Sequence, residues 1–383
     1  MRKVSSIFAL VLFSVVLFSC GGKGDNAGLE RVRVGVLNGI GSGDINMPEV
    51  YAACFLDSRI DAKYITTADI ASGVLDSLDV IVFPGGAGSA HTFSLGETNT
   101  EKVKEFARNG GGILAICAGG YALSHTPGYA CISMNGASVY DLDHSSRGQG
   151  LCAVKLTEEG KRVFPELKEA DTLYLLFENG PLLEPAESSR LGDATPYTVF
   201  VEMISDVYGM GGGEKGASVG KPFILGNNYG KGRICTSIGH PESTAGMMWM
   251  IPRLIRWCAG KSYTSFPETL CDPSLSVGEK ILTVEDLNKE ASLYHTFVYG
   301  TTEEKLEGVE WMKEHPSWSM KKWVESLLFD KDAKVRVAAA EFIAENQIIR
   351  WRDYVKGALK VEKDSLAKRE IEAADEYLDG LFY

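Results

Sequence analysis

Five apolar residues in a row, Ile113-Leu114-Ala115-Ile116-Cys117, lead directly into Ala118-Gly119-Gly120. An uninterrupted apolar run of this length is typical of a strand buried on both faces of a parallel sheet. Residues 121–124 then continue as a short helical run. A strand that turns sharply into a helix predicts a nucleophile elbow, with the Cys117 side chain at the carboxyl edge of the sheet. Considered by itself, Cys117 fits a buried structural cysteine at a strand end better.

The surrounding pattern extends this strand into a sheet. From residue 31 to about residue 261, short strand patterns alternate with helical or glycine-rich segments. Before Cys117, strands are predicted over 31–37, 62–66 and 78–83, and an amphipathic helix over 98–109. After Cys117, more hairpin-like strands are predicted over 152–156, 172–177, 197–203, 222–227 and 232–238. Strand–helix alternation predicts a doubly wound α/β sheet, and we place this domain at residues 31–262.

The strand patterns end near residue 265, and residues 263–383 are predicted as an all-α domain. Helices are expected over 284–299, 303–314, 319–329, 333–346, 351–361 and 365–381. The run Asp330-Lys331-Asp332-Ala333-Lys334-Val335-Arg336, followed by an alanine-rich helix, resembles a HEAT-repeat signature, in which helix pairs stack into a solenoid. A plain helical bundle is the alternative. Either arrangement predicts a structural or interaction module that docks a protein partner.

Length and charge narrow the class of protein. At 383 residues, two domains are more common than one. The chain carries 51 acidic and 39 basic residues, a formal net charge of −12, and has no run of five basic residues. Binding to a phosphate backbone depends on clustered positive charge, so nucleic acid is not expected as a partner.

The pattern of the N-terminal residues predicts a targeting segment. Arg2 and Lys3 precede an apolar stretch at 7–18, which is too short for a membrane span of about 20 residues. Leu17-Phe18-Ser19-Cys20 resembles a bacterial lipobox, so we expect residues 1–20 to be a lipoprotein signal peptide and Cys20 to be lipidated. Residues 21–30 would be a flexible tether. This predicts a periplasmic or surface-facing protein of the cell envelope, held to a bacterial membrane by lipid; an ordinary cleaved signal is the alternative.

Cysteine and histidine spacing gives no metal site. Seven cysteines follow Cys20, and an odd number in an oxidising compartment leaves at least one thiol unpaired within the chain. No Cys-x-x-Cys spacing occurs. His144, between acidic residues, fits a solvated loop better than a metal ligand. We expect no metal and no cofactor.

A histidine and a glutamate follow another predicted strand. The run Ser237-Ile238-Gly239-His240-Pro241-Glu242 ends the strand pattern at 232–238. Two residues apart after a strand, His240 and Glu242 can face one cleft, with the glutamate orienting the imidazole that deprotonates Cys117. By itself, this tripeptide would be a chance occurrence.

Glycines at a third strand exit supply hydrogen-bond donors. The strand at 78–83 ends in Pro84-Gly85-Gly86. The backbone N–H groups of Gly85 and Gly86, with that of Ala118, can stabilise a developing oxyanion. Considered alone, the Pro-Gly-Gly segment fits a simple turn that ends the strand sharply better than an oxyanion-binding site.

Three motifs each follow a predicted strand: Pro84-Gly85-Gly86, then Cys117-Ala118-Gly119, then His240-Pro241-Glu242. Their order along the chain resembles that of the class I glutamine amidotransferase superfamily. More narrowly, four segments are similar to the amidotransferase-like domain at the N-terminus of biotin–protein ligases: Val82–Gly86, Lys104–Phe106, Ile116–Tyr121 and Glu178–Pro181. The resemblance covers about residues 31–260. It implies a flavodoxin-like α/β/α fold with Cys117 as nucleophile, His240 as base and Glu242 as its orienting partner.

Three departures from the superfamily pattern bear on the substrate. Ala115 stands where amidotransferases carry glycine two residues before the nucleophile, and Tyr121 stands where a pocket glutamine is usual. Both departures count against glutamine as the substrate. Because Tyr121 takes the position of the pocket glutamine, we expect it to line the substrate pocket. Ala118 replaces the histidine that related proteases carry after the cysteine. Two functions remain open: hydrolysis of an amide or γ-glutamyl bond of a small amide or peptide through a thioester, or a non-catalytic scaffold that docks a partner through the helical domain.

Overall fold

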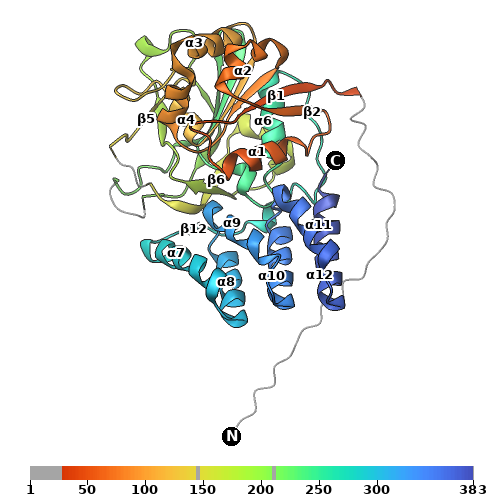
Figure 1. The fold of residues 1–383 in the computed structure, drawn as a ribbon. Coiled ribbons are helices and arrows are strands. Elements are labelled where there is room, and N and C mark those ends of the chain that lie inside the picture. The colour runs from red at the N-terminus through yellow and green to blue at the C-terminus, as the bar shows by residue number, and fades with distance from the viewer. Residues whose placement is uncertain (1–27, 144–146, 209–212, 383) are drawn as a thin grey trace.

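The computed structural model describes residues 28–143, 147–208 and 213–382, and Figure 1 draws their arrangement. The predicted signal peptide with Cys20, most of the predicted tether, and His144 lie outside these residues. Within them, no helix combines the length and the apolar character needed to cross a membrane.

A mixed sheet of ten strands forms the first part of the chain. Its parallel half has the order β2-β1-β3-β4-β11, which is the flavodoxin-like 2-1-3-4-5 order with β11 as the fifth strand. These strands are β1 (Val32–Leu37), β2 (Ile60–Ile65), β3 (Val80–Phe83), β4 (Gly112–Ile116) and β11 (Gly232–Ser237). The carboxyl ends of β3, β4 and β11 therefore meet at one edge of the sheet.

The other half of the sheet is antiparallel. The strand β10 pairs with β11 and β9, and β6 pairs with β7, β9 and β12. Their bounds are β6 (Gln149–Leu156), β7 (Leu173–Glu178), β9 (Thr198–Met203), β10 (Pro222–Tyr229) and β12 (Lys280–Ile281). A separate two-stranded sheet pairs β5 (Ala137–Val139) with β8 (Leu183–Pro185).

Helices cover both faces of the parallel half, as the alternation of its buried residues requires. In β3, Val80 and Val82 belong to one core cluster, and Ile81 and Phe83 belong to the other. One face packs against α1 (Asn46–Cys54) and α6 (Met250–Ala259), and the other against α2 (Thr67–Ala71), α3 (Gly88–Arg108) and α4 (Ala118–Leu123). The helix α5 (Glu158–Val163) packs on β9. The predicted doubly wound α/β/α fold is confirmed.

Two helices depart from the sequence prediction. The α3 helix begins ten residues before its predicted start at residue 98, and it is interrupted at Gly96, whose φ of 65° breaks the helical pattern. The α1 helix was not predicted: its N-cap is Ile45, which provides no side-chain cap. Without a Ser, Thr, Asp or Asn cap, the sequence lacks the usual sign of a helix start.

From Val284 onward the described chain is all-α, as predicted, whereas β12, which lies inside the predicted helical domain, is a strand that pairs with β6. The helices of this part are α7 (Val284–Tyr299), α8 (Thr302–Glu314), α9 (Trp318–Leu327), α10 (Ala333–Glu345), α11 (Arg352–Val361) and α12 (Ser365–Gly380). Helix α10 packs against α8, α9 and α12, and the consecutive pairs α7–α8, α9–α10 and α11–α12 are in contact (Figure 1). The helices therefore stack as hairpins; membership in the HEAT family stays a prediction.

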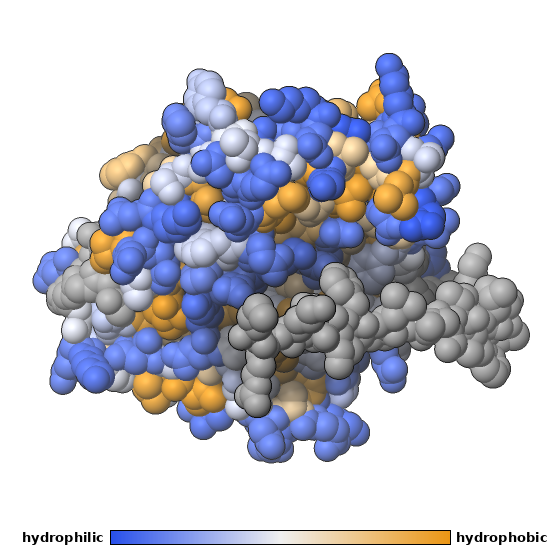
Figure 2. Space-filling view, turned by 90° about the horizontal axis from the view of Figure 1, so that it is seen from below, coloured by the Kyte–Doolittle hydropathy of each residue, from blue (hydrophilic) through white to orange (hydrophobic). Residues whose placement is uncertain are grey.

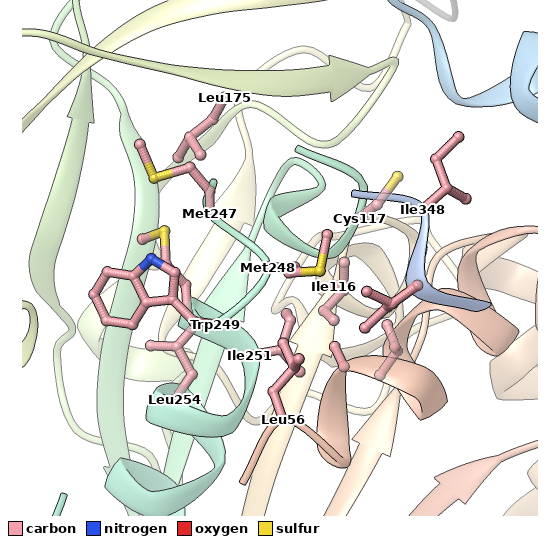
Figure 3. Packing of buried hydrophobic residues seen from close by; sticks show 14 of the residues in the cluster. Leu56, Ile116, Cys117, Leu175, Met247, Met248, Trp249, Ile251, Leu254 and Ile348 are labelled. Carbon is pink, nitrogen blue, oxygen red and sulfur yellow. The ribbon is translucent and has the colours of Figure 1, made fainter. Parts of the chain in front are cut away.

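The helical region shares a core with the sheet domain. Ile348, which follows α10, belongs to the same buried cluster as Cys117, and Figure 3 draws both among its side chains. The Gln347 side chain is fully buried and accepts a hydrogen bond from the Gly246 N–H at 2.8 Å. Residues of the helical region thus reach the part of the sheet edge where β4 and β11 end. From below, the visible surface is mainly hydrophilic with separate hydrophobic patches (Figure 2).

Candidate active site

Cys117 occupies a strained turn between β4 and α4. Its φ is 48° and its ψ is −103°, a conformation that residues other than glycine rarely adopt. The Cys117 N–H donates to the Ser237 carbonyl at the end of β11, at 2.8 Å, which fixes the turn to the neighbouring strand. At Gly119, a Cβ atom would lie 2.5 Å from the Phe83 carbonyl oxygen. Glycine is required there because α4 packs directly on the end of β3.

His240 and Glu242 form a buried pair beside this turn. His240 Nδ1 lies 2.7 Å from Glu242 Oε1, and both side chains are almost completely buried. The charge of Cys117 acts on His240, while the Cys117 thiol donates a hydrogen bond to the Glu178 carbonyl at 3.6 Å. Because Glu242 holds Nδ1, the other ring nitrogen, Nε2, is the one available to the thiol. The three predicted residues are therefore brought together in the order Cys117–His240–Glu242.

The electrostatics of this pair favour a charged imidazole. Burial alone lowers the pKa of His240, but the negative charges of Glu242 and Cys117 and their hydrogen bonds outweigh it. The pKa of His240 is therefore raised well above its ordinary value of 6.5. A histidine held beside a cysteine is the pairing that thiol nucleophiles use.

Asn46 and Gly85 also lie against the imidazole. Asn46 Nδ2 lies 3.3 Å from His240 Nδ1. A Cβ atom at Gly85 would lie 2.9 Å from His240 Cε1 and 2.8 Å from Asn46 Cγ. Gly85 thus leaves room for the ring, a role that the sequence did not indicate.

His91 supports the turn that carries Gly85 and Gly86. Its Nε2 lies 3.1 Å from the Pro84 carbonyl oxygen, and the ring packs edge-on against Phe83. Burial lowers the pKa of His91 to about 4, and the hydrogen bond to Pro84 opposes this only in part. The ring is therefore neutral at pH 7, with Nε2–H donating to the carbonyl.

A cavity of about 430 Å³ opens in front of the Cys117 thiol. Its lining residues are Gly86, Gly88, Cys117, Ala118, Tyr121, Tyr129, Leu142, Arg147, Gln149, Glu178 and Asn179. Of the predicted oxyanion donors, Gly86 and Ala118 line the cavity, and Gly85 does not. Neither the Gly86 nor the Ala118 N–H donates a hydrogen bond within the described part of the chain. Two backbone donors are thus available beside the thiol, which is the arrangement an oxyanion hole requires.

The predicted pocket residue Tyr121 lies in this cavity together with Arg147. Arg147 Nη1 donates to the Tyr121 hydroxyl at 2.5 Å, and that hydroxyl donates to the Asn179 carbonyl at 3.4 Å. The Arg147 N–H in turn donates to Asn179 Oδ1 at 3.0 Å. Burial raises the pKa of Tyr121 above its ordinary value, so the hydroxyl is neutral.

Charged residues from the helical region contact the loop that follows His240, at Ser243. Lys321, on α9, is buried, and its Nζ donates to the Ser243 carbonyl at 2.5 Å. Its Nζ lies 4.0 Å from Glu49, and Arg350 lies 3.6 Å from the same carboxylate. Glu49 also accepts a hydrogen bond from the Ser243 hydroxyl. Burial lowers the pKa of Lys321, an effect that the negative charge of Glu49 opposes.

Sequence reasoning missed Asn46, Arg147 and Lys321. Asn46 starts a helix without a recognisable cap, and Arg147 follows the loop that contains His144. Lys321 is one of two adjacent lysines, a pattern typical of a solvated helix face. No local signal distinguishes these residues, because each reaches the site through tertiary packing. Among the described residues, no group of three or more His, Cys, Asp or Glu side chains could hold a metal ion.

Comparison with known families supports the amidotransferase-like superfamily. Residues 60–134 match the family described as "Biotin-protein ligase, N terminal". This segment runs from β2 past α4, so it contains the Pro84-Gly85-Gly86 turn and Cys117, and it ends before His240 and Glu242. The matched segment agrees with the resemblance that the strand-exit motifs predict. No curated protein matches the chain.

Solved structures with low sequence identity overlap the α/β domain. A protein described as ThuA-like from Parabacteroides merdae is 13% identical, with a TM-score of 0.43, covering 62% of this chain and 94% of that one. The glutaminase domain of a CTPS from Trypanosoma brucei, solved with bound acivicin, is 15% identical, with a TM-score of 0.41, covering 61% of this chain and 96% of that one. At TM-scores below 0.5 these overlaps add nothing to the fold, which the strand order and register of this chain define.

Proposed function

We propose that this protein is a cysteine-nucleophile amidohydrolase that cleaves an amide or γ-glutamyl bond of a small substrate through a thioester on Cys117. One observation carries the proposal: Cys117 occupies a strained turn, its charge acts on His240, and His240 Nδ1 is held 2.7 Å from Glu242 Oε1. Strained backbone of this kind costs about 1–3 kcal/mol and persists where it serves a site.

In this mechanism, the Cys117 thiolate attacks the amide carbonyl carbon. The carbonyl electron pair moves onto oxygen, and the N–H groups of Gly86 and Ala118 donate to that oxyanion. The His240 imidazolium gives its proton to the amide nitrogen as the C–N bond breaks, and the amine leaves. A water molecule then attacks the thioester while His240 takes its proton. The C–S bond breaks, the carboxylic acid leaves, and the thiolate is restored.

The experiment is amine release from a panel of small amides and γ-glutamyl amides, with acid-quenched intact mass measured in parallel. We expect at least one substrate to give both free amine and an acyl adduct, which peptide mapping assigns to Cys117. The Cys117→Ala variant should give neither. If no member of a broad panel yields amine or adduct, the proposal fails and the non-catalytic scaffold becomes the better account.

We also propose export and anchoring through lipid on Cys20. The support is the sequence of residues 1–30, with its positive start, its short apolar stretch and the cysteine that follows. Several acyl chains on one cysteine would hold the protein to a membrane far better than one chain. Metabolic labelling with a fatty acid should mark the wild-type protein in the membrane fraction and leave Cys20→Ala unlabelled; label that persists in the variant would contradict the proposal.

A further inference from the structure

The N-terminal residues enter the fold at the amino edge of the parallel sheet, the edge at which its strands begin. Glu30, two residues before β1, is held there by the end of α6. Its carboxylate pairs with Lys261 Nζ at 2.7 Å, and its carbonyl oxygen accepts a hydrogen bond from Arg256 Nη1 at 3.2 Å. The Cys117 turn lies at the other edge, where β4 ends. The chain therefore enters on the side of the sheet away from the thiol.

Exposed cations surround this point of entry. Arg31 and Arg33 flank the first residue of β1, Lys231 and Arg233 flank the first residue of β11, and all four residues are exposed. A Cβ atom at Gly260 would lie 3.9 Å from the Arg233 guanidinium carbon. The basic residues of β11 thus lie beside the end of α6, which also holds the start of the chain.

Together these cations form a surface that we call the basic edge: Arg31, Arg33, Lys231, Arg233 and Lys261. Two of its charges are paired, because Asp79 lies 2.9 Å from Arg33 and Glu30 lies 2.7 Å from Lys261. Within the part of the chain that the structure describes, Arg31, Lys231 and Arg233 take part in no ion pair. The Arg233 guanidinium donates to a backbone carbonyl, which is a neutral acceptor. The basic edge therefore carries a net positive charge on a chain whose total charge is −12.

We propose that the basic edge rests on a membrane surface of anionic lipids, so that Cys117 faces away from the membrane. This inference rests on the proposed anchoring through Cys20. Glu30 follows Cys20 by ten residues, and even a fully extended chain of that length spans only about 35 Å. Lipid on Cys20 would therefore keep the amino edge close to the bilayer. Each Lys or Arg at an anionic lipid surface strengthens binding about fivefold.

The charge of the rest of the chain favours this orientation over others. Residues 284–383 carry 21 acidic and 15 basic residues, so an anionic surface repels the helical region. The strand β4 separates the two edges of the sheet by about 16 Å, which is twice the Debye length of about 8 Å at physiological ionic strength. Lipid headgroups can thus attract the basic edge without acting on the site. A substrate then reaches Cys117 from water and not from the bilayer.

The test measures how a form lacking residues 1–20 binds to lipid vesicles, so it needs no lipid on Cys20. The buried core begins at Val32, so this form keeps the fold. We expect it to sediment with vesicles of phosphatidylglycerol and phosphatidylcholine in equal amounts, and not with phosphatidylcholine alone. The triple variant Arg31→Gln, Lys231→Gln and Arg233→Gln should bind the mixed vesicles on the order of a hundredfold more weakly.

The matched control is the triple variant Lys331→Gln, Lys363→Gln and Lys368→Gln. It removes the same charge from exposed residues of the helical region, and it should bind as tightly as the unchanged form. Equal binding by the two triple variants, or equal binding to both kinds of vesicle, would overturn the basic edge as a lipid-binding surface.

A second measurement uses the full lipidated chain in membranes that contain phosphatidylglycerol. A sulfonated succinimidyl ester, which does not enter membranes, should acylate Lys363 faster than Lys231, and detergent should remove this difference. The same ratio in membranes and in detergent would overturn the orientation. Vesicle binding by the form without residues 1–20, together with no fatty acid on Cys20, would keep the basic edge and refute the anchor. Fatty acid on Cys20 with no vesicle binding would refute the basic edge alone.

Discussion

His240 Nδ1 lies 2.7 Å from Glu242 Oε1, and both side chains are buried. The carboxylate therefore sets both the orientation and the charge of the imidazole. Because Pro241 stands between them in a short 3-10 turn, Pro241–Ser243, the pair is held by the backbone of one loop. The following predictions test what this relationship and its surroundings do.

Removing the charge of Glu242 should lower the pKa of His240. In wild type, the imidazole stays protonated well above pH 6.5, because the negative charges of Glu242 and Cys117 outweigh the effect of burial. In Glu242→Gln the carboxylate charge is lost while the side chain keeps its shape. We expect the pKa of His240, measured by NMR titration of labelled histidine, to fall in this variant because the largest cause that raises it is removed. An unchanged titration would mean that Glu242 does not control the imidazole charge.

Acid should destabilise the protein through His91. Its pKa is about 4 when folded, against 6.5 ordinarily, so the unfolded chain binds the proton first as the pH falls. Stability is fully present above pH 6.5 and is lost as the pH falls through 4. The shift of 2.5 units corresponds to about 3 kcal/mol. Urea unfolding at pH 7 and pH 4 should show wild type losing up to about 3 kcal/mol more than His91→Gln; an equal loss in both would contradict this.

Glycine at position 117 should be better tolerated than alanine. The φ of 48° and ψ of −103° strain any residue with a Cβ atom, at a cost of about 1–3 kcal/mol. Glycine removes the strain but adds entropy to the unfolded chain, worth about 0.5–1 kcal/mol. We therefore expect the free energy of unfolding of Cys117→Gly to be about 1 kcal/mol higher than that of Cys117→Ala. The reverse order would show that the turn is not strained.

Lys321 should link the helical region to the loop that carries His240, Glu242 and Ser243. Its Nζ donates to the Ser243 carbonyl, next in the chain to Glu242. Lys321→Met should cost about 3–5 kcal/mol, because it leaves Glu49 buried with less compensation. Lys305→Met is the matched control, since Lys305 is equally buried and pairs with Asp330 within the helical region. Both should lower stability, but only Lys321→Met should change the alkylation rate of Cys117; equal effects on that rate would contradict the coupling.

The site residues that directly follow a strand could be predicted from the sequence, but the residues that pack around them could not. Cys117, Gly86 and His240 each follow a strand with a strong local pattern, and parallel strands bring their carboxyl ends to one edge. The six C-terminal helices were likewise predictable, because capping residues such as Thr283 and Thr301 mark their starts. Asn46, Arg147 and Lys321 were not, since their partners lie far away in the chain: Asn46 contacts His240, and Lys321 contacts Ser243. Local periodicity carries no information on such pairs.

The central claim is that Cys117 and His240 form a thiolate–imidazolium pair, and the most direct measurement is the pH dependence of Cys117 alkylation. A form lacking residues 1–20 would be treated with iodoacetamide from pH 5 to pH 9, and labelled cysteines mapped by mass spectrometry, beside His240→Ala. We predict that Cys117 is labelled fastest of all the cysteines, and that His240→Ala slows this labelling and changes its pH profile. An unreactive Cys117, or one whose pH profile is the same in His240→Ala, would contradict the account.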